Sequence, residues 1–104
     1  MVISDKKESE EESLKVKVFV RRNLKMTTNK TAAQVAHAVV GLGVGKPDVI
    51  VVLDASDKKF FELLDRLYEN DIKHHKDGSK YHVVVDAGYT EVEAGTRTCV
   101  AFVA

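Results

Sequence analysis

Residues 49–53 form an uninterrupted apolar run, Val-Ile-Val-Val-Leu, within a chain of 104 residues. A strand without polar alternation is typical of a sheet that is covered on both of its faces. The segment 14–21 alternates apolar and polar residues, which predicts a strand of period two. Two more strands are predicted at residues 81–85 and 96–103. A doubly covered strand in so short a chain requires helices against both sides of the sheet.

Two helices are predicted between these strands. In residues 31–42, apolar side chains recur with helical spacing, so one stripe of this segment is expected to face the sheet. Thr28 or Asn29 is expected to cap its start, and Pro47 enforces its end. Ser56 is expected to cap a second helix that ends near Glu69. The first stripe consists of Ala32, Val35, Ala36 and Val39, and the second of Phe60, Leu63, Leu64 and Leu67.

The order of these elements is βαβαββ. It predicts an α/β fold in which a mixed four-stranded sheet carries helices packed on its faces. A chain of this length has room for one domain. Residues 14–104 are expected to form that domain. Residues 1–13 are charged and lack periodicity, so they are expected to be a disordered acidic tail.

The charges are unevenly distributed, although the formal net charge is zero. Residues 1–13 hold five acids and two lysines, a net charge of −3. Residues 14–30 hold six lysines or arginines and no acid. A basic stretch of this kind attracts phosphates even in a neutral chain. The alternative is a strand edge and loop whose charges are simply solvated.

Several classes of protein do not fit this sequence. No apolar run is long enough to span a bilayer, and the polar, acidic first residues do not resemble a signal peptide. The single cysteine, Cys99, cannot form an internal disulfide, which fits a cytoplasmic location. His74 and His75 have no cysteine or carboxylate at ligand spacing, so no metal site is predicted. No serine or cysteine stands in a nucleophile elbow, so a covalent triad is not expected.

Two groups of polar residues are candidates for chemistry. Lys30, Gln34 and His37 share one face of the first helix with Gly41, and they would suit a polar cleft. The alternative is the solvated side of an amphipathic helix. Asp86 begins a loop directly after a strand, and ligand sites in α/β sheets gather at such ends. An ordinary aspartate–glycine turn is the alternative there.

Both groups fall within blocks that are similar to the signatures of the type 2 peptidyl-tRNA hydrolase family. The first family signature is roughly R-x-D-L-x-M-x-x-G-K-x-A-A-Q-x-x-H-A, and the second is roughly D-A-G-R-T-x-x-x-x-G-T-x-T. The matching residues here are Arg21-Arg22-Asn23-Leu24-Lys25-Met26, Lys30, Ala33-Gln34 and His37-Ala38, then Asp86-Ala87-Gly88, Thr90-Glu91, Gly95-Thr96 and Thr98. The resemblance covers residues 16–101, and the chain looks like a short, divergent member.

The resemblance implies hydrolysis of the ester bond between peptide and tRNA in peptidyl-tRNA, which recycles tRNA from aborted translation. It implies no metal or organic cofactor. The implied catalytic residues are Lys30, Asp86, Thr90 and His37, and the implied substrate-binding residues are Gln34, Lys25, Arg22, Thr96 and Thr98. Lys30 could stabilise the oxyanion or hold the terminal phosphate. Either Asp86 or His37 could be the base, since imidazole changes charge near neutral pH.

The chain also departs from the family pattern. Asn23, Asn29 and Tyr89 stand where an aspartate, a glycine and an arginine are usual, and Asp48 replaces a common lysine. The connection between His37 and the next strand is shorter than usual, and a final helix is missing. A non-catalytic relative that binds RNA or protein is therefore the alternative, and a small-molecule module without an RNA role is a third possibility. The missing helices would leave apolar surface, so a homodimer is expected.

Overall fold

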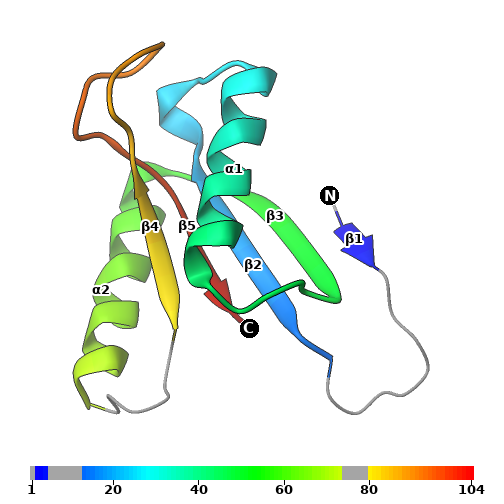
Figure 1. Ribbon diagram of the computed structural model, residues 1–104. Helices are drawn as coiled ribbons and strands as arrows, with labels where there is room; N and C mark the ends of the chain where they lie inside the picture. Colours follow the sequence, from blue (N-terminus) through cyan, green and yellow to red (C-terminus); the bar gives the residue numbers. More distant parts are fainter. Residues whose placement is uncertain (1, 5–12, 74–79) are drawn as a thin grey trace.

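The computed structural model describes residues 2–4, 13–73 and 80–104 and shows one mixed sheet between two helices (Figure 1). The strand order is β1-β3-β2-β5-β4. The central pair, β2 (Lys15–Arg21) and β3 (Val49–Ala55), is parallel. β5 (Arg97–Val103) runs antiparallel to β2, and β4 (Tyr81–Val85) runs antiparallel to β5. The predicted α/β class and the order βαβαββ are confirmed for the elements from β2 to β5.

A fifth strand at the sheet edge corrects the prediction for the first residues. β1 (Val2–Ser4) pairs antiparallel with β3, and Ile3 lies opposite Ile50. Valine and isoleucine favour extended backbone, and the open edge of β3 offers unpaired backbone groups for them to bond. Residues 2–4 are therefore not part of an irregular tail. Residues 5–12, the rest of the predicted acidic tail, lie outside the described residues.

The helices α1 (Thr28–Leu42) and α2 (Asp57–Lys73) cover opposite faces of the sheet, with α1 in front of β2 in Figure 1. A short 3-10 turn, η1 (Arg22–Leu24), connects β2 to the start of α1. The N-cap of α1 is Thr27, whose hydroxyl accepts the N–H of Lys30, so α1 begins earlier than predicted. Gly43, with φ of 68°, ends α1 in the left-handed conformation. No helix in the described parts of the chain is both long and apolar enough to cross a membrane.

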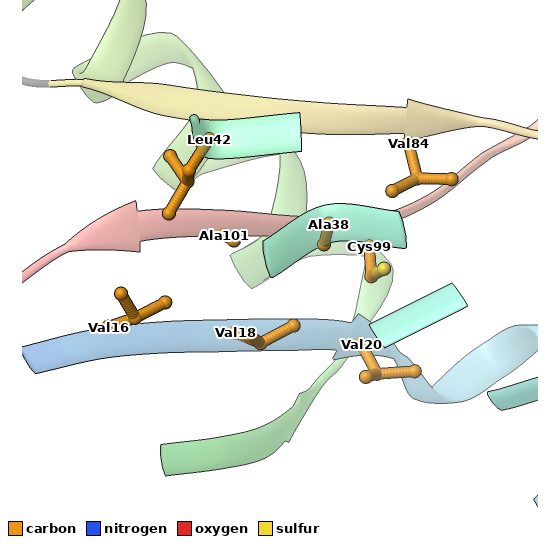
Figure 2. Packing of buried hydrophobic residues seen from close by; sticks show 8 residues of the cluster. All are labelled: Val16, Val18, Val20, Ala38, Leu42, Val84, Cys99 and Ala101. Carbon is orange, nitrogen blue, oxygen red and sulfur yellow. The ribbon is translucent and has the colours of Figure 1, made fainter. Parts of the chain in front are cut away.

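The face of the sheet toward α1 holds the larger buried cluster (Figure 2). Alternate valines of β2 point to this face, as the period of two predicts. Ala38 and Leu42 of α1 pack onto them. Phe60 of α2 packs on the other face against Val100 of β5. The cluster in Figure 2 consists of Val16, Val18, Val20, Ala38, Leu42, Val84, Cys99 and Ala101.

The buried face of α1 is not the predicted one. Gln34, Ala38 and Leu42, spaced by four residues, are the residues of α1 that are buried. The predicted apolar stripe lies beside this buried face of α1 and does not coincide with it. Its alanines are exposed, and Val35 and Val39 are only half-buried. Together with residues of β3 this stripe lines an apolar groove of about 570 Å³.

Candidate active site

Three side chains from distant parts of the chain meet near the start of α1. Lys30 lies on the first turn of α1, and Asp86 and Thr90 lie in the loop from β4 to β5. Lys30 Nζ donates to Asp86 Oδ1 at 2.8 Å and to Thr90 Oγ1 at 2.9 Å. The side chains of Lys30 and Asp86 are 10% and 6% exposed, so their ion pair is largely shielded from water. Three of the four predicted catalytic residues are thus in direct contact.

Gln34 connects this cluster to the core of the domain. Its Nε2 donates to Asp86 Oδ1 at 2.9 Å, and its Oε1 accepts the hydroxyl of Thr98 at 2.7 Å. The Cys99 thiol donates to the backbone oxygen of Gln34 at 3.3 Å. Because both ends of the amide have partners, the side chain has one favourable orientation. Gln34 therefore holds Asp86 in place. Burial also raises the pKa of the neighbouring Cys99 thiol to about 11, so this thiol stays protonated.

An irregularity between β4 and β5 makes this arrangement possible. Val84 lies opposite Cys99 and Val85 lies opposite Arg97, so Thr98 has no partner residue in β4. Such a bulge interrupts the alternation of side chains between the two faces. As a result, Thr98 and Cys99 both reach Gln34 on the same face. Thr98 is 0% exposed. Its predicted contact with substrate is therefore wrong, and its hydroxyl orients Gln34 instead.

Replacing Thr98 by valine should test this orienting role. Valine has nearly the same shape but leaves the buried Gln34 Oε1 without its donor, which is expected to lower the free energy of unfolding by about 1–2 kcal/mol. The turnover number should fall as well, because the amide that holds Asp86 can then rotate. Chemical denaturation and steady-state kinetics measure the two effects. Thr31→Val on α1 is the matched control, and a Thr98→Val protein with unchanged kinetics would contradict the role.

The loop after β4 is folded back onto Asp86 and onto α1. Gly88 has φ of 87° and donates its N–H to Asp86 Oδ2 at 2.7 Å. A Cβ at Gly88 would lie 2.7 Å from the backbone nitrogen of Ala94, so a larger residue does not fit. Glu91 accepts both the N–H and the hydroxyl of Thr27, at 2.8 and 2.6 Å. The loop that carries Thr90 is thereby tied to the residue that caps α1.

The cluster opens on a cleft of about 880 Å³ between α1 and β4. His37 is exposed and lies on the cleft wall, one turn of α1 after Gln34. Gly41 lies farther along the same wall. The predicted polar stripe of α1 therefore faces a cleft rather than open solvent. Among the described residues, no three histidine, cysteine or acidic side chains are close enough to hold a metal ion.

The electrostatics of the site keep Asp86 charged. The hydrogen bond from Lys30 is the largest influence, and it lowers the pKa of the Asp86 carboxyl below the ordinary 3.8. The Gly88 N–H, the charge of Lys30 and the Gln34 amide lower this pKa further, against the opposing effect of burial. A carboxyl with a lowered pKa accepts a proton less readily than an ordinary one. Asp86 is therefore suited to hold Lys30 and less suited to act as a base.

The Asp86 carboxyl is expected to stay ionised at every pH above its ordinary pKa of 3.8. Since the pKa is lower in the folded chain than in the unfolded chain, this carboxylate stabilises the fold above that value and loses its contribution as the pH falls through the native pKa. Carbon-13 NMR of the Asp86 carboxyl should show a midpoint below 3.8, and Lys30→Met should raise that midpoint. A midpoint above 3.8 in the unmodified protein would contradict the pairing.

The other predicted substrate-binding residues lie outside the cleft lining. Arg22 and Lys25 are exposed in and just after η1, on the chain segment that leads into α1. Thr96 donates its hydroxyl to the backbone oxygen of Glu93 at 2.7 Å, so it closes the loop between β4 and β5. Sequence reasoning missed the link between Glu91 and Thr27. A threonine three residues before Lys30 is a capping signal that could have indicated one end of that link.

Arg21, the first residue of the first signature block, has a structural contact. Its guanidinium donates to both carboxylate oxygens of Asp57, at 3.0 and 3.1 Å. These bonds lower the pKa of the Asp57 carboxyl. Arg21 also donates to the backbone oxygen of Arg97. It therefore joins the end of β2 to the start of α2, on the far side of the sheet from the cleft.

Comparison with known proteins gives consistent results. A family model described as "Peptidyl-tRNA hydrolase PTH2" matches residues 14–46, which span β2, η1 and α1. A peptidyl-tRNA hydrolase of Haloquadratum walsbyi is 34% identical, covering 85% of this chain and 83% of the relative. One of Thermoplasma volcanium is 36% identical, with 84% and 81% covered. One of Saccharolobus solfataricus is 30% identical, with 83% and 82% covered.

The Saccharolobus solfataricus protein also has residues that this chain lacks. Its match extends over 106 aligned positions, more than the 104 residues of this chain, although only 83% of this chain takes part. The Thermoplasma volcanium match extends over only 95 aligned positions, so a shortening relative to the family as a whole stays a prediction. The signature blocks, their contact in the folded chain and the identity to these relatives lead to one conclusion: the chain belongs to the PTH2 family of peptidyl-tRNA hydrolases.

Proposed function

We propose that this protein hydrolyses the ester bond between peptide and tRNA in peptidyl-tRNA, and so recycles tRNA from aborted translation. The observation that carries the proposal is the contact of Lys30 with Asp86 and Thr90 at one end of an open cleft. Attack of water on an ester creates a negative charge on the carbonyl oxygen, and fixed hydrogen-bond donors stabilise that charge. The names of the relatives support peptidyl-tRNA as the substrate. Translation takes place in the cytoplasm, which is the location we propose.

The donors for the carbonyl oxygen are Lys30 and Thr90. The Lys30 ammonium has three N–H groups, of which Asp86 and Thr90 accept two. The third N–H and the hydroxyl proton of Thr90 are left to bond the ester oxygen. Asp86 balances the charge of Lys30 and fixes its direction. The cluster therefore binds the developing oxyanion more strongly than the neutral ester, which is the requirement for catalysis.

We assign the role of base to His37. Asp86 accepts three hydrogen bonds and has a lowered pKa, so it is a weak proton acceptor. His37 lies on the wall of the same cleft, where water has access. Its imidazole takes a proton from the attacking water and returns it to the ribose oxygen as the ester bond breaks. The second proton of the water stays on the new carboxyl group and is then released to solvent, so the products are a peptide with a free carboxylate and a tRNA with a free terminal hydroxyl.

The experiment that tests the function is release of an N-acetylated amino acid from tRNA by the purified protein. The unmodified protein should release it with turnover, and His37→Gln should lower the turnover number while leaving tRNA binding intact. Salt-sensitive tRNA binding without any turnover would contradict the proposal and indicate a non-catalytic binding protein. Arg22 and Lys25, exposed before α1, are proposed to contact the RNA backbone. Replacing both by alanine should therefore weaken tRNA binding and make its affinity less dependent on salt concentration.

We also propose that the protein is a homodimer. The groove beside α1 is lined mainly by apolar side chains, among them Met26, Val35, Val39, Ile50 and Val52. Apolar surface of this kind is usually covered in solution, and symmetric dimers are the most common way for one chain to cover it. Light scattering should give twice the mass of one chain. A monomer mass at high protein concentration would contradict the dimer.

A further inference from the structure

One edge of the sheet borders the cleft. β4, yellow in Figure 1, is the last strand of the sheet and pairs, within the described residues, only with β5. His82 near its start lies against Gly41, close to the end of α1. Val85 at its end lines the cleft, and Asp86 directly after it contacts Lys30, close to the start of α1. β4 therefore runs along the cleft and ends at the candidate active site.

The backbone groups of β4 alternate between β5 and the open edge. Neighbouring residues of an antiparallel strand direct their N–H and C=O groups to opposite sides. The oxygen of Lys80 accepts an N–H from β5, and the N–H and oxygen of Asp86 both bond the segment 95–96 just before β5. The bulge lies in β5, so it leaves the alternation within β4 intact. The N–H and C=O groups of Val83 and Val85 therefore point to the open edge.

This edge lacks the features that usually block a sheet edge. Exposed edge strands commonly carry lysine, another charged residue or proline, which prevent pairing with a further strand. β4 reads Tyr-His-Val-Val-Val and contains none of these. Valine favours extended, paired backbone, and Val85 is 58% exposed. An edge of this kind is suited to bind an extended peptide through its main chain.

The charges of the cleft favour a peptide over nucleic acid along β4. Among the described residues that line the cleft, Lys30 is the single lysine or arginine, and it lies at the end next to Asp86. A nucleic-acid backbone needs cations, whereas a peptide backbone needs N–H and C=O partners. Peptides from aborted translation share no side chains, so the main chain is the one feature by which all of them can be bound.

We infer, on the basis of the proposed function, that the open edge of β4 binds the peptide of peptidyl-tRNA as an additional strand. The ester lies at Lys30 and Thr90, so the peptide ends where β4 ends and runs parallel to it. In a parallel pair, one residue bonds both neighbours of the residue opposite. The peptide residue opposite Val84 therefore donates its N–H to the oxygen of Val83 and accepts the N–H of Val85.

This peptide residue is the one before the esterified amino acid. The ester carbonyl points to Lys30 and Thr90, which leaves the N–H of Val85 for another acceptor. Successive carbonyl groups of an extended chain point in opposite directions, so the preceding carbonyl is the one that points to β4. The amide N–H one residue farther from the ester points away from β4.

The test uses the unmodified protein and three substrates on one tRNA body. The first is N-acetylglycylglycylphenylalanyl-tRNA, and the other two carry an N-methyl group on the second or on the first glycine. Methylation of the second glycine removes the donor to Val83 and should lower kcat/KM about tenfold, the effect of one lost hydrogen bond. Methylation of the first glycine is the matched control and should leave kcat/KM unchanged, because that N–H points away from β4.

Val85→Pro tests the neighbouring bond from the side of the enzyme. Proline removes the outward N–H of Val85 and is tolerated on an edge strand, because the bonds to β5 remain. For the unmethylated substrate, kcat/KM should fall about tenfold, while the affinity for deacylated tRNA is retained. The Asp86 carboxyl should keep its midpoint below 3.8, which shows that the adjacent site is intact. Unchanged kcat/KM in the folded variant would overturn the role of this N–H.

The three substrates also separate the inference from the proposed function. Equal kcat/KM for all three would overturn the pairing with β4 and leave the proposed function standing. An equal loss with either methyl group would overturn the pairing as well, since the bulk of the methyl group then explains the effect. If the unmodified protein cleaves none of the three, the proposed function fails and the inference fails with it.

Discussion

Replacing Asp86 by asparagine is expected to lower kcat/KM by about a thousandfold, within the range for loss of a residue that organises polar catalysis. Three N–H donors converge on the two oxygens of Asp86, from Lys30, Gln34 and Gly88. Asparagine offers one oxygen and places an NH₂ group where the other oxygen was, so at least one donor faces another donor. The Lys30 ammonium also loses its counterion in a largely shielded position. Its direction toward the ester is then no longer fixed.

Asp65→Asn on α2 is the matched control for this prediction, because Asp65 is exposed on the opposite side of the sheet. It should leave kcat/KM unchanged. Thermal unfolding of both variants separates loss of chemistry from loss of fold. If folded Asp86→Asn protein retains more than about a tenth of the activity, the carboxylate is not the organising group that the contacts with Lys30 and Gln34 indicate.

The meeting of Lys30, Asp86 and Thr90 could be anticipated from sequence. Lys30 and Gln34 are four residues apart in a helical segment, so their side chains share a face. Asp86 follows a strand, where loops form sites. Helical spacing and strand alternation are local, and both depend on backbone geometry that every residue shares. The similarity to the family signatures supplied the remaining step, which is that these two segments act together.

The bulge between β4 and β5 could not be anticipated in the same way. Residues 96–103 read as one strand, and nothing in their order indicates that Thr98 has no opposite residue. A bulge is set by pairing between strands, which sequence patterns along one strand do not encode. This is why Thr98 was expected at the substrate and lies beneath Gln34.

The rotation of α1 was mispredicted for a related reason. The stripe of Ala32, Val35, Ala36 and Val39 looks like a buried face, whereas the polar Gln34 looks exposed. In the folded chain Gln34 is buried because Asp86 and Thr98 satisfy both ends of its amide. Burial of a polar side chain depends on partners far away in the sequence, so periodicity alone assigns it to the wrong side.

Replacing Lys30 by methionine is expected to lower kcat/KM by about 10²–10³-fold, the usual effect of removing one donor to a developing oxyanion. Methionine keeps much of the length of the side chain and removes its charge and all three N–H groups. Asp86 and Thr90 both lose the donor that joins them. Lys58→Met, at an exposed position near the start of α2, is the control and should leave kcat/KM unchanged.

The combination of the two changes separates a single catalytic unit from two independent contributions. If Asp86 acts by holding Lys30, then Asp86→Asn in a protein that already carries Lys30→Met has little left to remove. The double variant should therefore be about as active as the less active of the two single variants, because the free-energy effects of groups that act as a unit are not additive. If the two losses of activity multiply in the double variant, Asp86 has a contact of its own with water or substrate. In that case Asp86, rather than His37, would be assigned the role of base.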